Sequence, residues 1–155
     1  MTKDEYKRAK KLLKLAYAIV ATVPGVPCIY YGDEAGMQGY RDPFNRLPFP
    51  WGKEDNEILD FYRKIGKIRR NEAVFKGGLF KLIECNSDIL AFARYKDDEF
   101  TVTMVNRSQE KYNFDTNIPL KSCENGRKIS AIKPLSACVL KGKGNIDSLE
   151  LDFYK

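Results

Sequence analysis

The fold is decided by Pro24-Gly25-Val26-Pro27-Cys28-Ile29-Tyr30-Tyr31-Gly32-Asp33-Glu34. The middle of this stretch, residues 26–31, is a short run of apolar, β-branched and aromatic residues with a glycine on each side. Such a run, following closely behind a helix, is typical of a fully buried parallel strand. Because a helix, a short loop and a buried strand alternate in parallel α/β folds, the stretch predicts an α/β unit.

A helix is predicted over residues 2–23, before this strand. Thr2 and Glu5 have the spacing of a capping box, in which a hydroxyl and a carboxylate satisfy backbone N–H groups. Pro24-Gly25 is a helix stop signal. Between these signals, apolar residues recur at three- and four-residue steps and predict one buried face: Tyr6, Ala9, Leu12, Leu13, Ala16, Tyr17 and Val20.

The residues after the strand predict a long loop and a second helix. Residues 32–53 have no periodicity and are rich in Gly and Pro. A loop of this length inside a compact domain is usually functional. The second helix is predicted over 55–72, and Gly77-Gly78 marks a boundary. Its buried face would consist of Ile58, Phe61, Tyr62, Ile65 and Ile68.

Beyond Gly78 the apolar period changes to two. Strands are predicted at 79–85, 89–95 and 100–106, with shorter ones at 112–114, 128–132 and 137–140. Short strands joined by polar turns are typical of antiparallel sandwiches and barrels. The chain is therefore predicted to be an α/β piece, residues 1–77, followed by an all-β antiparallel sandwich domain, residues 78–155.

Composition and charge exclude several classes of protein. The chain is 43% hydrophobic and 31% charged, as in folded globular domains, and its longest apolar run is too short to span a bilayer. The net charge is +6, with one basic cluster on the first helix: Lys7, Arg8, Lys10, Lys11 and Lys14. No nucleic-acid recognition motif accompanies this cluster, so we interpret it as a solvated helix face. We expect no nucleic-acid and no membrane partner.

The absence of histidine and the spacing of the cysteines exclude familiar catalytic and metal sites. Cys28, Cys85, Cys123 and Cys138 form no CxxC pair, and there is no His. A zinc cluster and Ser-His or Cys-His catalysis are thereby excluded, and we expect no metal and no cofactor in this chain. Two disulfides are an open alternative, but the apolar surroundings of Cys28 and Cys138 favour buried free thiols. Free thiols favour a cytoplasmic location.

The Pro24–Glu34 stretch resembles the end of the catalytic (β/α)8 barrel of the α-amylase family. The resemblance continues through Gly36, Gly39, Asp42-Pro43, Arg46 and Pro50-Trp51, and it is strongest to the neopullulanase, cyclomaltodextrinase and maltogenic amylase branch. Residues 68–78 are similar to the family's passage from the last barrel helix into its C-terminal β-domain. The resemblance implies that 26–31 is the last barrel strand and that 78–155 are the family's β-sandwich.

The same resemblance implies an α-glucan hydrolase that acts on starch, maltodextrins or cyclodextrins with retention. The family's three catalytic carboxylates lie earlier, after barrel strands four, five and seven. We therefore expect no catalytic residue in this chain, no activity of the chain alone, and calcium as a candidate ligand of the parent enzyme only. Asp33 and Glu34 do not replace the missing carboxylates. Adjacent residues leaving a strand point to opposite sides, whereas a retaining pair lies roughly 5–5.5 Å apart across one bond.

Asp42 and Arg46 are the candidate substrate-binding residues. They stand four apart in a tight Asp-Pro turn and can present a carboxylate and a guanidinium to sugar hydroxyls. By resemblance, they match the family's loop residues at the glucosyl units on the non-reducing side of the cut. An ion pair that only holds the loop shape is the alternative, and both stay open. Trp51 can stack on a sugar, but in this loop it is interpreted as an anchor of the loop against the barrel.

Two expectations concern the chain as a separate object. A stand-alone carbohydrate-binding or interaction module is the alternative function, although it explains the β-domain and not the helix-strand-helix part. A single barrel strand would have two unpaired edges, which favour pairing with another chain. We therefore expect self-association through residues 26–31, with the rest of the barrel as the natural partner in the parent.

Overall fold

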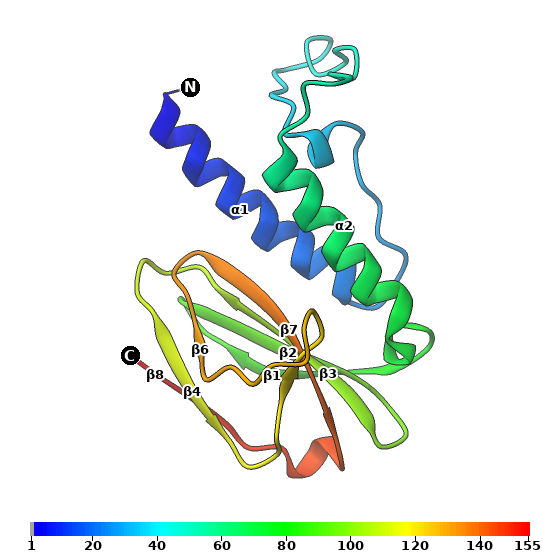
Figure 1. Cartoon of the computed structure of the whole chain (residues 1–155), viewed down its shortest axis with the longest axis vertical. Helices are drawn as coiled ribbons and strands as arrows, with labels where there is room; N and C mark the ends of the chain where they lie inside the picture. The colour runs from blue at the N-terminus through cyan, green and yellow to red at the C-terminus, as the bar shows by residue number, and fades with distance from the viewer. Residues whose placement is uncertain (1) are drawn as a thin grey trace.

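The computed structural model describes residues 2–155 and places two helices side by side on one face of a β unit (Figure 1). Helix α1 spans Lys3–Thr22 and helix α2 spans Asn56–Asn71. Short 3-10 turns stand on either side of α2, η1 at Asp33–Ala35 and η2 at Ala73–Phe75. The loop between the helices extends from the end of the molecule that lies away from the sheets (Figure 1).

The β unit contains two antiparallel sheets. The larger has the order β1-β2-β3-β7-β5, built from β1 (Leu79–Cys85), β2 (Ile89–Lys96), β3 (Glu99–Asn106), β7 (Ser136–Lys143) and β5 (Lys121–Ser122). The smaller has the order β6-β4-β8, built from β6 (Ala131–Ile132), β4 (Tyr112–Thr116) and β8 (Leu151–Tyr154), with η3 (Ile146–Ser148) before β8. Five of the strands predicted after Gly78 are present, the one predicted at 128–132 is reduced to Ala131–Ile132, and β5 and β8 were not predicted.

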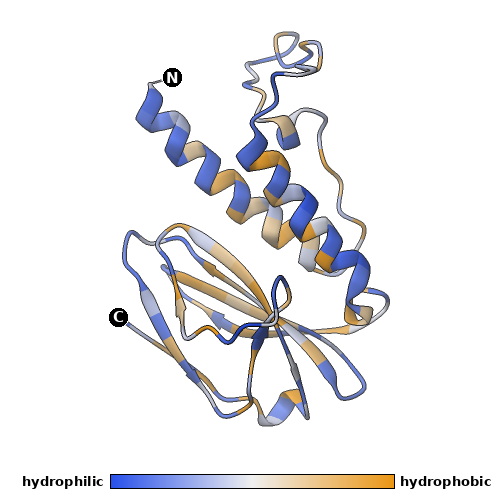
Figure 2. Cartoon of the chain, viewed as in Figure 1, coloured by the Kyte–Doolittle hydropathy of each residue, from blue (hydrophilic) through white to orange (hydrophobic). Residues whose placement is uncertain are grey.

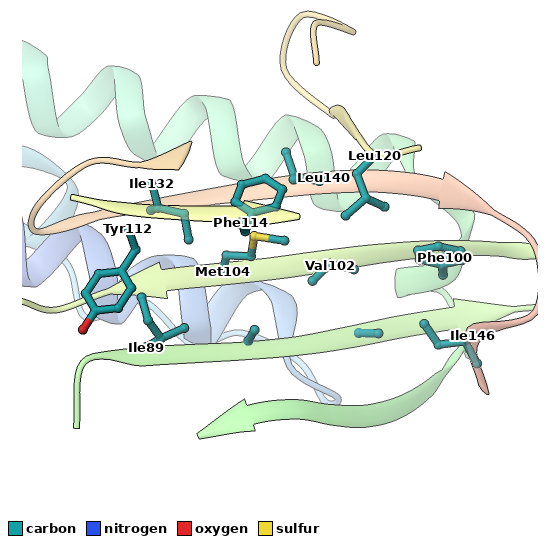
Figure 3. Close-up of a cluster of buried hydrophobic side chains, with 12 residues drawn as sticks. Ile89, Phe100, Val102, Met104, Tyr112, Phe114, Leu120, Ile132, Leu140 and Ile146 are labelled. Carbon is teal, nitrogen blue, oxygen red and sulfur yellow. The ribbon is translucent and has the colours of Figure 1, made fainter. Parts of the chain in front are cut away.

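The main core lies between these two sheets (Figure 3). Strand alternation points Phe100, Val102 and Met104 of β3 to this side, where they meet Phe114 of β4 and Leu140 of β7. Each of these five side chains is at most 2% exposed. Burying one such side chain contributes roughly 1.5–3 kcal/mol, so this core contributes much of the stability of the β unit.

A second core joins the helices to the opposite face of the larger sheet. Tyr17 and Ala21 of α1 pack with Tyr62 and Ile65 of α2 and with Val139 of β7. The rings of Tyr17 and Tyr62 are stacked, with centroids 3.7 Å apart. Figure 2 shows hydrophobic colour along the central strands and mixed colour along both helices, as expected for helices that bury one side only. No helix within residues 2–155 is long and apolar enough to cross a membrane.

Arg69 of α2 binds the C-terminal end of α1. Its guanidinium donates hydrogen bonds to the carbonyl of Ala21 at 2.7 Å and to that of Gly25 at 2.5 Å. The last turn of α1 contains no basic residue of its own, although free carbonyls and the helix dipole favour positive charge there. Arg69 supplies that charge and fixes the direction in which the chain leaves α1.

Arg94 of β2 reaches the same end of α1 from the sheet. Its guanidinium donates to the Gly78 carbonyl at 2.7 Å and to the Thr22 carbonyl at 3.5 Å, and the residue is only 4% exposed. The ring of Phe75 lies 5.9 Å from the guanidinium carbons of both Arg94 and Arg69. Burial, with a smaller effect of the Arg69 charge, lowers the pKa of Arg94. The two arginines thus tie the helices and the sheet together at one point.

Residues 26–31 do not form the predicted strand. They run as irregular chain between α1 and η1, and within residues 2–155 they pair with no strand. Val26 is 93% exposed, and Ile29, Tyr30 and Tyr31 are also exposed. The prediction was wrong because a parallel strand needs neighbours at its edges and cover on both faces, and residues 2–155 provide neither.

The prediction of buried thiols also needs correction. All four cysteines are free, but Cys28 and Cys85 are exposed, while Cys123 and Cys138 are partly buried. Cys28 is exposed because it belongs to the segment that forms no strand. Burial raises the pKa of the Cys123 and Cys138 thiols to about 12, so both remain protonated and unreactive at neutral pH.

Arg94→Met should lower the free energy of unfolding by roughly 2–4 kcal/mol, because buried carbonyls lose charge-assisted hydrogen bonds. Urea unfolding of the purified chain measures the loss. The matched control is Arg70→Met, an exposed neighbour of Arg69 on α2, which should change stability by less than about 0.5 kcal/mol. Equal, small effects of the two substitutions would contradict the role given to Arg94.

Candidate functional site

The loop between the helices begins with a tight turn around η1. Gly32 and Gly36 flank this turn with φ of 92° and 72°, in the left-handed region that favours glycine. The backbone N–H of Asp55 donates to the Ala35 carbonyl at 2.9 Å, which fastens η1 to the start of α2. Both ends of the loop are therefore held together by the contact between η1 and the start of α2.

Asp33 and Glu34 both belong to this turn. The Glu34 carboxylate accepts a hydrogen bond from the backbone N–H of Gly32 at 2.9 Å, so it has a structural role. Burial raises the pKa of Asp33 above its ordinary 3.8, and the negative charge of Glu34 raises it further. The two neighbours thus have different environments.

Basic residues of α1 hold the start of α2. Lys10 makes ion pairs with Asp55 at 2.8 Å and with Glu57 at 2.6 Å, and Lys14 pairs with Glu57 at 2.5 Å. The Tyr6 hydroxyl donates to Asp55 at 3.0 Å. Burial alone would raise the pKa of Asp55, but hydrogen bonds from Lys10 and Tyr6 hold it below its usual value. Part of the basic cluster, interpreted from the sequence as a solvated face, is in fact engaged in packing the helices.

Sequence reasoning missed this network. The signal was the four-residue spacing of Lys10 and Lys14, which places both on one helix face, and the acidic Asp55 and Glu57 at the start of the next helix. Their complementary charges were visible, but the contact depends on how α1 and α2 pack, and that is not a local property.

Asp42 and Arg46 are brought together at the tip of the loop. The Arg46 Nε lies 2.8 Å from the Asp42 Oδ1, and their side chains are 71% and 62% exposed. A carboxylate and a guanidinium held in this way offer acceptors and donors to the same ligand. The ion pair exists, and solvent reaches both groups.

Three aromatic side chains of the same loop face solvent. Tyr40, Phe44 and Trp51 are 71%, 65% and 81% exposed. Trp51 contacts Phe49, with ring centroids 4.6 Å apart. Trp51 is therefore not buried against a core within residues 2–155. Exposed aromatic rings beside polar groups are suited to sugars, whose rings carry C–H groups on their faces.

Two cavities lie between the loop and the helices. Their volumes are about 490 Å³ and 380 Å³, and Tyr6, Gly36 and Met37 line both. Lys53 and Asp55 line the larger cavity, and Asp33 and Tyr40 line the smaller. The loop is thus hollowed on the side facing α1, and its polar and aromatic residues are accessible from that side.

Residues 1–71 match the α-amylase catalytic domain. This family is named Alpha-amylase, and its description reads "Alpha amylase, catalytic domain". The amylopullulanase of Thermoanaerobacter thermohydrosulfuricus is 46% identical over 86 residues, which are 56% of this chain and 6% of that protein. The cyclomaltodextrinase of Thermoanaerobacter pseudethanolicus is 32% identical over 139 residues, 83% of this chain and 24% of that protein. The chain therefore spans less than a quarter of the length of either relative.

The structural likeness extends beyond the catalytic-domain match. A maltogenic amylase from S. marinus superposes with a TM-score of 0.75 and 31% sequence identity, over 88% of this chain and 20% of that one. The alpha-amylase from Geobacillus thermoleovorans, solved with acarbose, gives a TM-score of 0.77 and 26% identity over 88% of this chain. Since both superpositions reach past residue 71, the β unit also resembles part of these amylases.

Asp33→Asn should raise the melting temperature at pH 7. A carboxyl with a raised pKa in the folded state resists losing its proton, so its charge destabilises the fold above that pKa. Below pH 3.8 the carboxyl is protonated in both folded and unfolded chains, and the difference between the two proteins should vanish. Thermal melts at pH 7 and pH 3 test this, with Asp98→Asn in the exposed turn between β2 and β3 as the control. A variant that melts lower at pH 7 would show that the Asp33 charge stabilises the turn.

Proposed function

We propose that this chain is the C-terminal part of an α-glucan-active glycoside hydrolase of the α-amylase family. In this proposal residues 1–77 complete the (β/α)8 catalytic barrel and residues 78–155 form the C-terminal β-sandwich domain. The single observation that carries it is the match of residues 1–71 to the catalytic domain. The names of the relatives, amylopullulanase, cyclomaltodextrinase and maltogenic amylase, support starch-type glucans as the substrate.

In the parent enzyme, the loop at 32–53 would lie beside the reacting bond. Barrel enzymes carry their active sites on the loops that follow the barrel strands, and this loop follows the segment that would be the last strand. A retaining double displacement needs a nucleophile and an acid/base carboxylate on either side of the bond, which the parent would supply from other loops. Glu34 already binds the backbone of its own turn. We therefore propose that the chain alone hydrolyses no α-glucan.

Asp42 and Arg46 would bind the glucan rather than cleave it. The Asp42 carboxylate accepts hydrogen bonds from sugar hydroxyls, and the Arg46 guanidinium donates to them. Their ion pair at 2.8 Å orients both groups before the substrate arrives. Orientation in advance reduces the entropy lost on binding. A stand-alone carbohydrate-binding module, the alternative function, leaves the match of the first 71 residues unexplained.

Self-association of the separate chain is also proposed, on a different basis from unpaired strand edges. Residues 26–31 expose Val26, Ile29 and Tyr30, which the remaining barrel would cover in the parent. Exposed apolar patches favour association. Light scattering over a wide concentration range should show dimers or larger species, and Val26→Lys with Ile29→Lys should shift them towards monomer. A wild-type chain that stays monomeric at high concentration would remove this part of the proposal.

Asp42→Ala and Arg46→Ala in the full-length enzyme should impair substrate use far more than stability. An exposed ion pair contributes roughly 0–1 kcal/mol to folding, whereas a charge-assisted hydrogen bond to substrate contributes roughly 1.5–3 kcal/mol. We expect kcat/KM on maltoheptaose and cyclodextrins to fall at least tenfold, with the melting temperature nearly unchanged. Lys133→Ala, an exposed residue of the β unit, is the control. Parallel losses of melting temperature and activity would instead favour a shape-holding pair.

A further inference from the structure

Another cleft lies near the C-terminal end of α2, whereas the loop at 32–53 leads into the N-terminal end of that helix. It has a volume of about 450 Å³, and its walls come from η2, from β3 and β7, and from the chain around β5. This volume is in the range of small-molecule sites, roughly 300–1,000 Å³. Because α2 has 16 residues and rises about 1.5 Å per residue, its two ends are roughly 24 Å apart. The cleft is therefore separate from the Asp42–Arg46 loop.

Charges of both signs line the cleft. Lys141 of β7 pairs with Glu72 at 2.8 Å, and Lys143 pairs with Glu99 of β3 at 3.2 Å. Lys121 of β5 stands opposite Lys141 in the strand register, and no ion pair is recorded for it within residues 2–155. The lining thus combines two carboxylates with three ammonium groups, and within residues 2–155 one of these ammonium groups has no carboxylate partner.

One residue that lines the cleft carries a buried hydroxyl without a hydrogen-bond partner. Thr101 pairs with Lys141 in the β3–β7 register, lines the cleft and is 1% exposed. Its Oγ1 is one of two buried side-chain polar atoms without a hydrogen-bond partner in residues 2–155. Buried polar groups nearly always have partners, so this exception needs an explanation. Apolar atoms of Val74 and Pro119 line the same cleft beside the polar groups.

We propose that this cleft binds a neutral sugar, a glucosyl unit of an α-glucan chain. A sugar hydroxyl donates to a carboxylate and accepts from an ammonium group at the same time, which suits a lining of mixed sign. A simple anion would meet Glu72 and Glu99, and a simple cation would meet three lysines. The C–H groups of the sugar ring suit Val74 and Pro119, and a ligand hydroxyl is the natural partner for Thr101. The choice of glucose as the sugar rests on the proposed function.

Titration of the ¹⁵N-labelled chain with maltotriose, followed by NMR, tests this site directly. Saturable shifts are expected at the backbone amides of 99–101, 120–121 and 141–143. Lys121→Ala should weaken binding roughly tenfold, the effect of losing one charge-assisted hydrogen bond. Thr101→Val keeps the side-chain shape and should weaken binding roughly fivefold. Lys133→Ala, an exposed lysine of the same β unit outside the cleft, should leave the affinity unchanged.

Three results would overturn the inference. One is the absence of any shift in the millimolar range. Another is a set of shifts confined to residues 39–53, which would leave the proposed function standing. The third is equal or tighter binding of inorganic phosphate at the same amides, which would make the cleft an anion site. Conversely, binding in the cleft together with full activity of the Asp42→Ala and Arg46→Ala enzymes would count against the loop and not against the cleft.

Discussion

The structure depends on two guanidinium groups at the C-terminal end of α1. A helix end leaves carbonyls without partners, and burying it against a sheet is costly unless something donates to them. Arg69 comes from α2 and Arg94 from β2, and both bind carbonyls at this end of α1. Because the two donors belong to different elements, one capped helix end also fixes α2 and the larger sheet relative to α1. The packing of Tyr17, Tyr62 and Val139 follows from that placement.

The other end of α1 is held by ionic contacts, and this determines where the loop lies. Lys10 and Tyr6 bind Asp55, the residue that caps α2. Hydrogen bonds from Lys10 and Tyr6 keep the pKa of Asp55 low despite its burial, so this contact weakens only as the pH falls towards the pKa. The whole connection between the two helices is therefore fixed at both of its ends, at Gly25 by Arg69 and at Asp55 by α1. Its aromatic and charged residues extend from that frame into solvent.

Structural features that depend on local periodicity were predicted from the sequence. Features that depend on contacts between distant parts of the chain were missed. Both helices and the antiparallel strands are visible as periods of 3.6 and two, because each element has one buried face. Residues 26–31 have the composition of a buried strand, but composition does not supply neighbours, and the segment is irregular in the described chain. Cys28 was misjudged for the same reason. Asp42 and Arg46 were found together because four residues in a turn are a local relation.

The two roles considered for Asp42 and Arg46, holding the shape of the loop and binding substrate, rest on the same ion pair in two different surroundings. In this chain both side chains are more than half exposed, and water screens their attraction. An ion pair in such surroundings contributes roughly 0–1 kcal/mol, too little to determine the path of a long loop. Where other loops cover the pair and exclude water, the effective dielectric constant falls and the same 2.8 Å contact becomes stronger. A covered carboxylate and guanidinium would then also need hydrogen-bond partners, and in the proposed function sugar hydroxyls would provide them. In the proposed function, the surface that covers the loop would therefore decide whether the two residues form only a weak ion pair or a binding site.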